Sequence, residues 1–142
     1  MLPVQLATQV KTQLDACVSH GPQDEFIGLL GGARATAWLR VECLIPLSNQ
    51  AARTDCFAVD PLAFANAEHA IRQAGASWLG FVHSHPHGQV GLSTTDRAQL
   101  WRDCVQLIVA RRALGELAVA GYWLTERGSQ TLTLLPDHEA RP

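Results

Sequence analysis

One nine-residue stretch, SWLGFVHSH at residues 77–85, limits the possible folds more than any other part of the chain. Its apolar character continues as far as Val82, without the alternation of apolar and polar residues that a half-exposed strand shows. A strand of this kind is typical of the centre of a layered α/β domain, where both faces of the sheet are covered. His83 and His85 stand at its carboxyl end, and His87 follows. We therefore expect a buried central strand that carries polar side chains to one edge of the sheet.

The segments on both sides of this strand predict an alternation of helices and strands. Apolar spacing, together with proline at helix starts and glycine at helix ends, favours helices over Val4–Val18, over Pro61–Ala74, and from Ser93 to about Arg102. Asp60 is expected to cap the second helix. Short apolar runs closed by glycine or proline predict strands at Phe26–Leu30, Ala35–Ile45, within DCFAVDP (55–61), at Val105–Ala110, Leu117–Leu124 and Gln130–Leu135. The sequence therefore predicts an α/β fold.

Length, charge and hydropathy restrict the class of protein further. A chain of 142 residues with 47% hydrophobic and 17% charged residues is expected to form one folded domain over 1–142, with 136–142 as a flexible polar tail. A formal net charge of −2 gives no reason to expect nucleic acid as a partner. No stretch approaches the roughly 18 apolar residues of a membrane span, and the start lacks a signal-peptide pattern. We expect a cytoplasmic protein with no membrane partner.

The four cysteines are widely scattered, and none forms a C-x-x-C pair. They are Cys17, Cys43, Cys56 and Cys104. This pattern favours small buried apolar residues rather than a disulfide framework or a cysteine-based metal site.

The histidines after the central strand predict a metal site. His83 and His85 are two residues apart, so on an extended strand their side chains point to the same side. Asp96 lies in the first turn of the next helix, where its carboxylate can complete a set of three ligands. Two imidazoles and a carboxylate suit zinc, and three protein ligands leave the fourth position open, as in catalytic sites. A solvated loop with a helix cap is the competing interpretation, and H-x-H alone would favour that reading.

The longer pattern decides between these interpretations. His83-Ser-His85-Pro, then seven residues to Ser93 and Ser-x-x-Asp96, resembles the JAMM motif of MPN-plus zinc metallopeptidases. The glutamate of that family, found upstream before a Gly-Leu-Leu segment, matches Glu25 in DEFIGLLGG. The resemblance covers roughly the first hundred residues. It implies a single MPN (JAB-like) domain with a mixed central β-sheet flanked by helices.

The resemblance also implies a role for each matching residue. His83, His85 and Asp96 would be the ligands of a Zn²⁺ cofactor, and Glu25 would act as general base and then general acid on the attacking water and the leaving amine. Ser93 would stabilise the developing oxyanion through its hydroxyl. Glu42, Glu68 and Glu116 could compete as the base, but none stands before a Gly-Leu-Leu segment. His20, His69, His87 and His138 are expected to bind no metal.

The substrate follows from the resemblance only as a class. The family cleaves amide or isopeptide bonds after the C-terminal Gly-Gly of ubiquitin-like proteins, and the compact chain resembles its small, stand-alone bacterial members. The expected partner is a ubiquitin-like (β-grasp) protein, released from a precursor or a conjugate, with activating and conjugating enzymes as further candidate partners. The alternative is hydrolysis of a sulfur-carrier adduct in cysteine- or thiamine-type biosynthesis.

Two other classes remain as competing hypotheses. The first is a non-catalytic MPN scaffold that has kept its metal, against which the presence of Glu25 and Ser93 argues. The second is a different zinc hydrolase or a deaminase. Zinc deaminases use a P-C-x-x-C segment, and the sequence has none.

Overall fold

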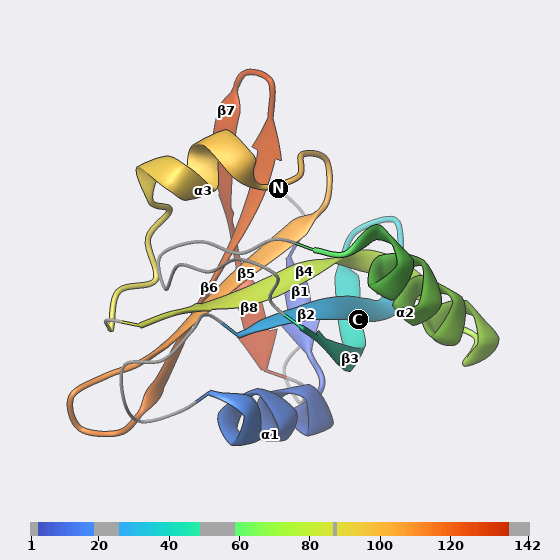
Figure 1. Ribbon diagram of the computed structural model, residues 1–142, viewed down its shortest axis with the longest axis horizontal. Helices are drawn as coiled ribbons and strands as arrows, with labels where there is room; N and C mark the ends of the chain where they lie inside the picture. Colours follow the sequence, from blue (N-terminus) through green and yellow to red (C-terminus); the bar gives the residue numbers. More distant parts are fainter. Residues whose placement is uncertain (1–2, 19–25, 49–58, 87, 137–142) are drawn as a thin grey trace.

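The computed structural model describes residues 3–18, 26–48, 59–86 and 88–136, and their strands form one mixed sheet (Figure 1). The strand order is β7-β6-β5-β4-β2-β3-β1-β8. The strands are β1 (Val4–Leu6), β2 (Ile27–Arg34), β3 (Leu39–Leu47), β4 (Ser77–His85), β5 (Val105–Arg111), β6 (Leu117–Thr125), β7 (Gly128–Leu132) and β8 (Leu134–Pro136). The pairs β4–β5, β1–β3 and β1–β8 are parallel, and the others are antiparallel. The predicted mixed sheet flanked by helices is confirmed.

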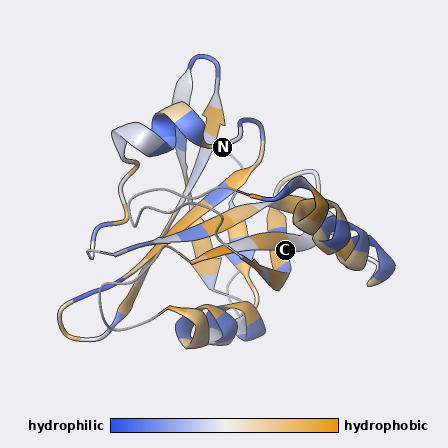
Figure 2. Cartoon of the chain, in the orientation of Figure 1, coloured by the Kyte–Doolittle hydropathy of each residue, from blue (hydrophilic) through white to orange (hydrophobic). Residues whose placement is uncertain are grey.

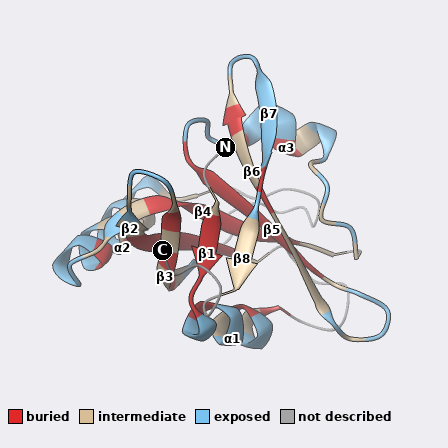
Figure 3. Cartoon of the chain, turned by 180° about the vertical axis from the view of Figure 1, so that it is seen from behind, coloured by how far each residue is buried: buried red, intermediate tan, exposed pale blue. Residues whose placement is uncertain are grey.

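Strand β4 is the central strand that its apolar run predicts. It lies between β2 and β5, and all residues from Leu79 to Ser84 are buried. Successive side chains point to opposite faces. Phe81 therefore packs into one apolar cluster and Val82 into the other. Burial is high in β1, β4 and β5 and low in β7, as Figure 3 shows.

The helices α1 (Thr8–Cys17) and α2 (Pro61–Gln73) cover different faces of the sheet. Val10 and Leu14 of α1 pack into the cluster that contains Val82, whereas Ala67 and Ile71 of α2 pack into the cluster that contains Phe81. Both helices turn apolar residues inward and polar residues outward (Figure 2). The start of α2 is as predicted, because the Asp60 carboxylate accepts a hydrogen bond from the Ala63 N–H and Pro61 occupies the first turn.

The expectation of a helix over Val4–Val18 is wrong in its first turn. The helix begins at Thr8, and Val4–Leu6 is strand β1, in parallel pairing with β3 and β8. All three β1 residues are buried, including Gln5. Apolar spacing over so few residues fits either structure, and pairing with strands far along the chain decided it.

Smaller differences concern the ends of other elements. Helix α3 (Thr94–Gln99) ends before Arg102, and the strand predicted over Gln130–Leu135 is two strands, β7 and β8. The expected strand in DCFAVDP lies mostly outside the described residues. Cys104 is buried as expected, Cys17 and Cys43 are half-buried, and Cys56 lies outside the described residues. None of the helices described is long and apolar enough to cross a membrane.

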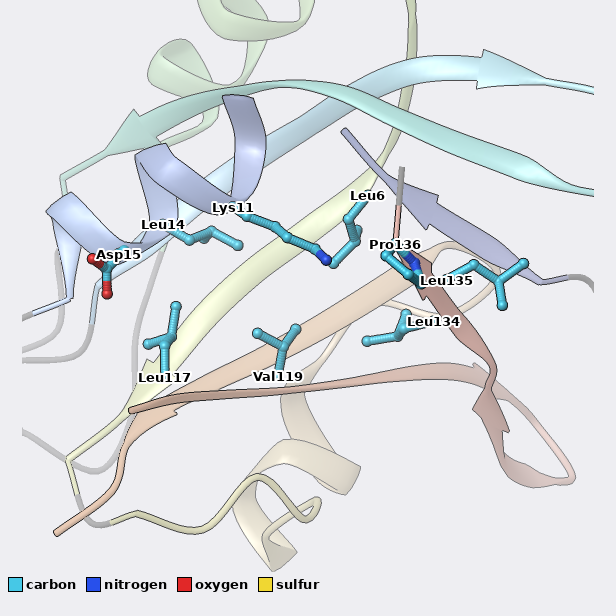
Figure 4. A pocket seen from close by; sticks show the side chains of 9 residues that line it. All are labelled: Leu6, Lys11, Leu14, Asp15, Leu117, Val119, Leu134, Leu135 and Pro136. Carbon is cyan, nitrogen blue, oxygen red and sulfur yellow. The ribbon is translucent and has the colours of Figure 1, made fainter. Parts of the chain in front are cut away.

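The division of the last strand opens a groove in the fold. Strand β7 pairs with β6 from Gly121 to Thr125, and the chain then moves across to pair with β1 as β8. A groove of about 380 Å³ remains between α1, β6 and β8 (Figure 4). It is lined by Leu6, Lys11, Leu14, Asp15, Leu117, Val119, Leu134, Leu135 and Pro136. Its apolar residues include members of the α1-side cluster, so it opens on the face opposite to Phe81.

Candidate metal centre

The three predicted ligands converge at the carboxyl end of β4. The Nε2 atoms of His83 and His85 are 3.2 Å apart. The His83 Nε2 lies 3.1 Å from one carboxylate oxygen of Asp96, and the His85 Nε2 lies 3.0 Å from the other. These three residues are the one group of metal-ligand type found among the described residues. The structure therefore brings together the ligand set expected from the sequence.

The distances between these atoms fit a tetrahedral ion. Zinc binds histidine nitrogen and carboxylate oxygen at about 2.0–2.2 Å, which places neighbouring ligand atoms of a tetrahedron about 3.3–3.5 Å apart. The observed separations of 3.0–3.2 Å are only slightly shorter. One ion can therefore be bound by all three residues after a small spreading of the side chains. Three ligands leave one coordination position for water or substrate.

Local structure explains how each ligand reaches the site. His83 and His85 share a face of β4 because they are two residues apart in an extended strand. By the same alternation they share the face of Phe81, which is opposite to the groove of Figure 4. Asp96 is held by a capping box at the start of α3, where its Oδ2 accepts the Ser93 N–H at 2.9 Å and its own N–H donates to the Ser93 Oγ at 3.0 Å.

Two backbone carbonyls of the loop between β4 and α3 are contacted by polar side-chain atoms. The His85 Nδ1 lies 2.9 Å from the Gln89 carbonyl oxygen, and the Tyr122 hydroxyl donates to the Val90 carbonyl at 2.8 Å. A ring that donates its Nδ1–H to a carbonyl keeps the Nε2 lone pair for a metal. The Gln89 carbonyl and Tyr122 thus support the site. No sequence signal predicted either contact, because both depend on how the loop folds back.

Helix α3, which carries Asp96, is followed by an aromatic cluster that anchors it. The Trp101 ring contacts Phe64, Trp78 and Phe81, with ring centroids 5.0–6.1 Å apart. Arg97, which belongs to α3 itself, donates to the Ser129 hydroxyl of β7 at 3.1 Å. Aromatic contacts of this kind hold neighbouring elements in a defined orientation. The carboxylate ligand is therefore fixed to the same core as the two histidines.

Burial and hydrogen bonding set the protonation states of the ligands. Burial raises the pKa of the Asp96 carboxyl, but hydrogen bonds from His83 and His85 lower it more, and its pKa lies well below the usual range. Burial lowers the pKa of the His83 imidazole, against the opposing effect of its hydrogen bond to Asp96. An ionised carboxylate and a neutral imidazole are the forms that bind metal. His83 is fully buried, whereas the His85 side chain is 12% exposed, so solvent reaches the site from the side of His85.

The other site predictions have different outcomes. Ser93 lies beside the ligands through its hydrogen bonds to Asp96, and its proposed role in the reaction stays a prediction. Glu25, with His20, His87 and His138, lies outside the described residues. His69 is exposed on α2 and is not a member of the group formed by His83, His85 and Asp96. Two competing acids are engaged elsewhere, Glu42 with Arg40 and Glu68 with Arg72.

Comparisons with known proteins support the fold and the motif. The sequence family described as prokaryotic homologs of the JAB domain matches residues 8–128. A solution structure of a protein from Desulfitobacterium hafniense has 22% sequence identity and a TM-score of 0.83, over 98% of this chain and 99% of that one. A solution structure of a protein from Salinibacter ruber has 20% identity and a TM-score of 0.68, over 97% and 94%. No curated protein matches this chain.

Proposed function

This chain belongs to the family of prokaryotic JAB-domain proteins, and from that premise we propose that it is a zinc-dependent peptidase or isopeptidase that cleaves after the C-terminal Gly-Gly of a ubiquitin-like protein. The observation that carries the proposal is the convergence of His83, His85 and Asp96, with one side of the group open to solvent. A closed set of four protein ligands would favour a structural metal instead. Among the described residues the set has three members rather than four, and this supports hydrolysis.

The reaction assigns one task to each side chain. His83, His85 and Asp96 would hold the zinc, which would supply a Lewis acid that lowers the pKa of a bound water towards about 7. Glu25 takes the proton from the attacking water and delivers it to the leaving amine, so the peptide bond is exchanged for a carboxylate and a free amine. The Ser93 hydroxyl accepts from the Asp96 N–H, which leaves its own proton to donate to the oxyanion.

The first experiment tests the metal and the ligands. The purified protein is expected to contain about one zinc per chain, measured by elemental analysis. His83→Ala and Asp96→Ala are expected to lose it, whereas the control His69→Ala, on the exposed surface of α2, is expected to keep it. Unchanged zinc in His83→Ala or Asp96→Ala would overturn the ligand assignment.

The second experiment tests the substrate class. The protein is incubated with three substrates: a ubiquitin-like protein extended past its Gly-Gly, the same protein joined to a lysine side chain, and a sulfur-carrier protein with a C-terminal adduct. Cleavage of either of the first two, abolished in Glu25→Gln with zinc retained, supports the proposal. Cleavage of the third alone would select the sulfur-carrier alternative. A zinc-loaded protein whose Glu25→Gln variant is unchanged in every assay would favour a scaffold.

A further inference from the structure

We propose that Ser84 and Arg111 are positioning residues for the general base, because they hold the two residues that flank the segment carrying Glu25. This inference rests on the proposed function, in which Glu25 moves the proton. It is carried by contacts of Val18 and Phe26, the described residues on either side of 19–25. Ser84 holds Phe26, and Arg111 holds Val18.

The Phe26 contact is an exception within the pairing of β2 with β4. The register Ile27↔His83 places Phe26 opposite Ser84, and the Ser84 N–H donates to the Phe26 carbonyl at 2.9 Å. In a regular antiparallel pair of this kind, the Phe26 N–H would donate to the Ser84 carbonyl. Here it donates to the Ser84 Oγ instead, at 2.7 Å. The hydroxyl therefore replaces one bond of the ladder at the residue next to Glu25, and β2 begins at the following residue, Ile27.

The Val18 contact is made by a side chain that donates to four acceptor atoms on three residues. The Arg111 guanidinium donates to the Val18 carbonyl at 2.8 Å, to the Asp15 carbonyl at 2.9 Å and to the Asp15 carboxylate at 2.6 Å. It also donates to the Gly115 carbonyl at 3.0 Å, in the turn before β6. The last carbonyls of a helix have no partner within the helix. Arg111 thus binds the end of α1 and the residue at which the chain leaves it, and its own side chain is only 9% exposed.

Both holding residues belong to the framework that carries the metal ligands. Ser84 lies between His83 and His85 in β4, and Arg111 follows Ala110, which is paired with His85 across β4 and β5. Any shift of these two strands would therefore move the ligands and both ends of 19–25 together. Ser84 and Arg111 therefore connect the described residues on both sides of 19–25 to the strands that carry His83 and His85. A catalytic group displaced by about 1 Å can cost on the order of a hundredfold in rate.

The decisive test is Ser84→Ala, with Ser84→Thr as the conservative variant and Ser77→Ala as the matched control. Ser77 is exposed at the other end of the same strand. Ser84→Ala is expected to keep its zinc and its KM and to lose kcat by about tenfold to a hundredfold. Hydrogen exchange of the amides of 19–26 is expected to become faster. Ser84→Thr is expected to restore both properties, and Ser77→Ala to change neither.

The contact with Val18 is tested with Arg111→Met and Arg111→Lys. Arg72→Met is the control, because Arg72 is an arginine paired with Glu68 on the surface. Arg111→Met is expected to show the same pattern of faster exchange and lower kcat, and Arg111→Lys a smaller change. If Arg111→Met fails to fold, the Ser84 variants decide alone. Unchanged kcat and unchanged exchange in Ser84→Ala would overturn the inference, as would loss of its zinc, which would make Ser84 a support of the ligands only.

Failure of the proposed function and failure of the positioning role give different results. If the wild-type protein cleaves none of the three substrates, the proposed function fails. Hydrogen exchange of 19–26 in Ser84→Ala then still measures whether the hydroxyl holds this segment. If the wild-type protein is active and Ser84→Ala matches it in both measurements, only the positioning role fails.

Discussion

At the scale of single residues, the site is built from side chains that each make two kinds of contact. The Asp96 carboxylate accepts the Ser93 N–H and also faces both histidines, so one group caps α3 and completes the ligand set. The Ser93 hydroxyl accepts the Asp96 N–H, and in the proposed reaction its own proton is donated to the oxyanion. The Ser-x-x-Asp spacing therefore predicted two features, the start of α3 and one residue of the metal motif.

The double use of Ser93 predicts two separable effects of its substitution. Ser93→Ala is expected to lower kcat by about 10²–10³, because one oxyanion donor is lost, and to lower the free energy of unfolding by about 1 kcal/mol, because the cap is lost. Ser93→Thr keeps the hydroxyl and is expected to retain most of both. Steady-state kinetics and urea unfolding measure the two effects. A Ser93→Ala protein that loses stability but keeps its kcat would show that the hydroxyl is only a cap.

The cysteines provide a prediction that is independent of the metal. Burial raises the pKa of the Cys104 thiol to about 12, and the nearby Asp103 charge acts in the same direction. A raised thiol pKa means less thiolate at any given pH, and the thiolate is the reactive form. Iodoacetamide at pH 8.5 is therefore expected to label Cys17, which is half-buried, long before Cys104. Peptide mass spectrometry measures the labelling.

Unfolding gives the control for this prediction. In urea, Cys104 is expected to react as fast as Cys17, because its environment is lost. Equal labelling of Cys17 and Cys104 in the folded protein would contradict the burial of Cys104.

At the scale of elements, the pairing of β4 with β5 positions the centre. Gly80 faces Val105 across this pair, and a Cβ at Gly80 would lie 1.9 Å from the Val105 carbonyl oxygen. Backbone atoms cannot move aside without separating the two strands. The absence of a side chain at this position therefore allows the close approach that holds β4, with both histidine ligands, in the sheet.

Gly80→Ala is accordingly expected to lower the free energy of unfolding by about 3 kcal/mol or more, at the upper end of overpacking effects. The matched control is Gly91→Ala, because a Cβ at Gly91 would meet no atom within 4 Å. Thermal and urea unfolding of the two variants measure the difference. Equal stability of Gly80→Ala and Gly91→Ala would show that the strands can separate at low cost.

At the scale of the whole molecule, the apolar core is independent of the metal ligands. The two apolar clusters lie on opposite faces of the sheet and are built from contacts among apolar side chains. In the metal-free protein the Asp96 carboxylate still accepts the Ser93 N–H, and its two oxygens lie 3.1 and 3.0 Å from the Nε2 atoms of His83 and His85. The fold therefore has no need of the metal to bury its core.

Chelation is therefore expected to abolish hydrolysis. The near-ultraviolet circular dichroism of the aromatic cluster around Trp101 is expected to stay unchanged. Chelation is expected to lower the free energy of unfolding only by the binding free energy of the ion, so the melting temperature falls and rises again with added zinc. Circular dichroism and calorimetry, with and without zinc, measure these effects. Cooperative unfolding on chelation alone at 25 °C would instead identify the ion as part of the folding core.

The sequence by itself determined the three residues of the candidate metal centre and most of the element order. The apolar run ending in His83 and His85 predicted the central strand, the Ser-x-x-Asp spacing predicted the start of α3, and together they predicted the ligand set that the structure brings together. These signals are local, because strand alternation and helix capping depend only on nearby residues. Glu25 was assigned from the resemblance and stays a prediction.

Only the tertiary structure decided the features that join distant segments. Val4–Leu6 became a strand because β3 and β8 pair with it, and β7 separated from β8 because β1 offered a second partner. The Ser84 contact with Phe26 and the Arg111 contact with Val18 span 58 and 93 residues of the chain. No pattern within a short window contains such pairs, because their free energy depends on which backbone groups the completed fold leaves without partners.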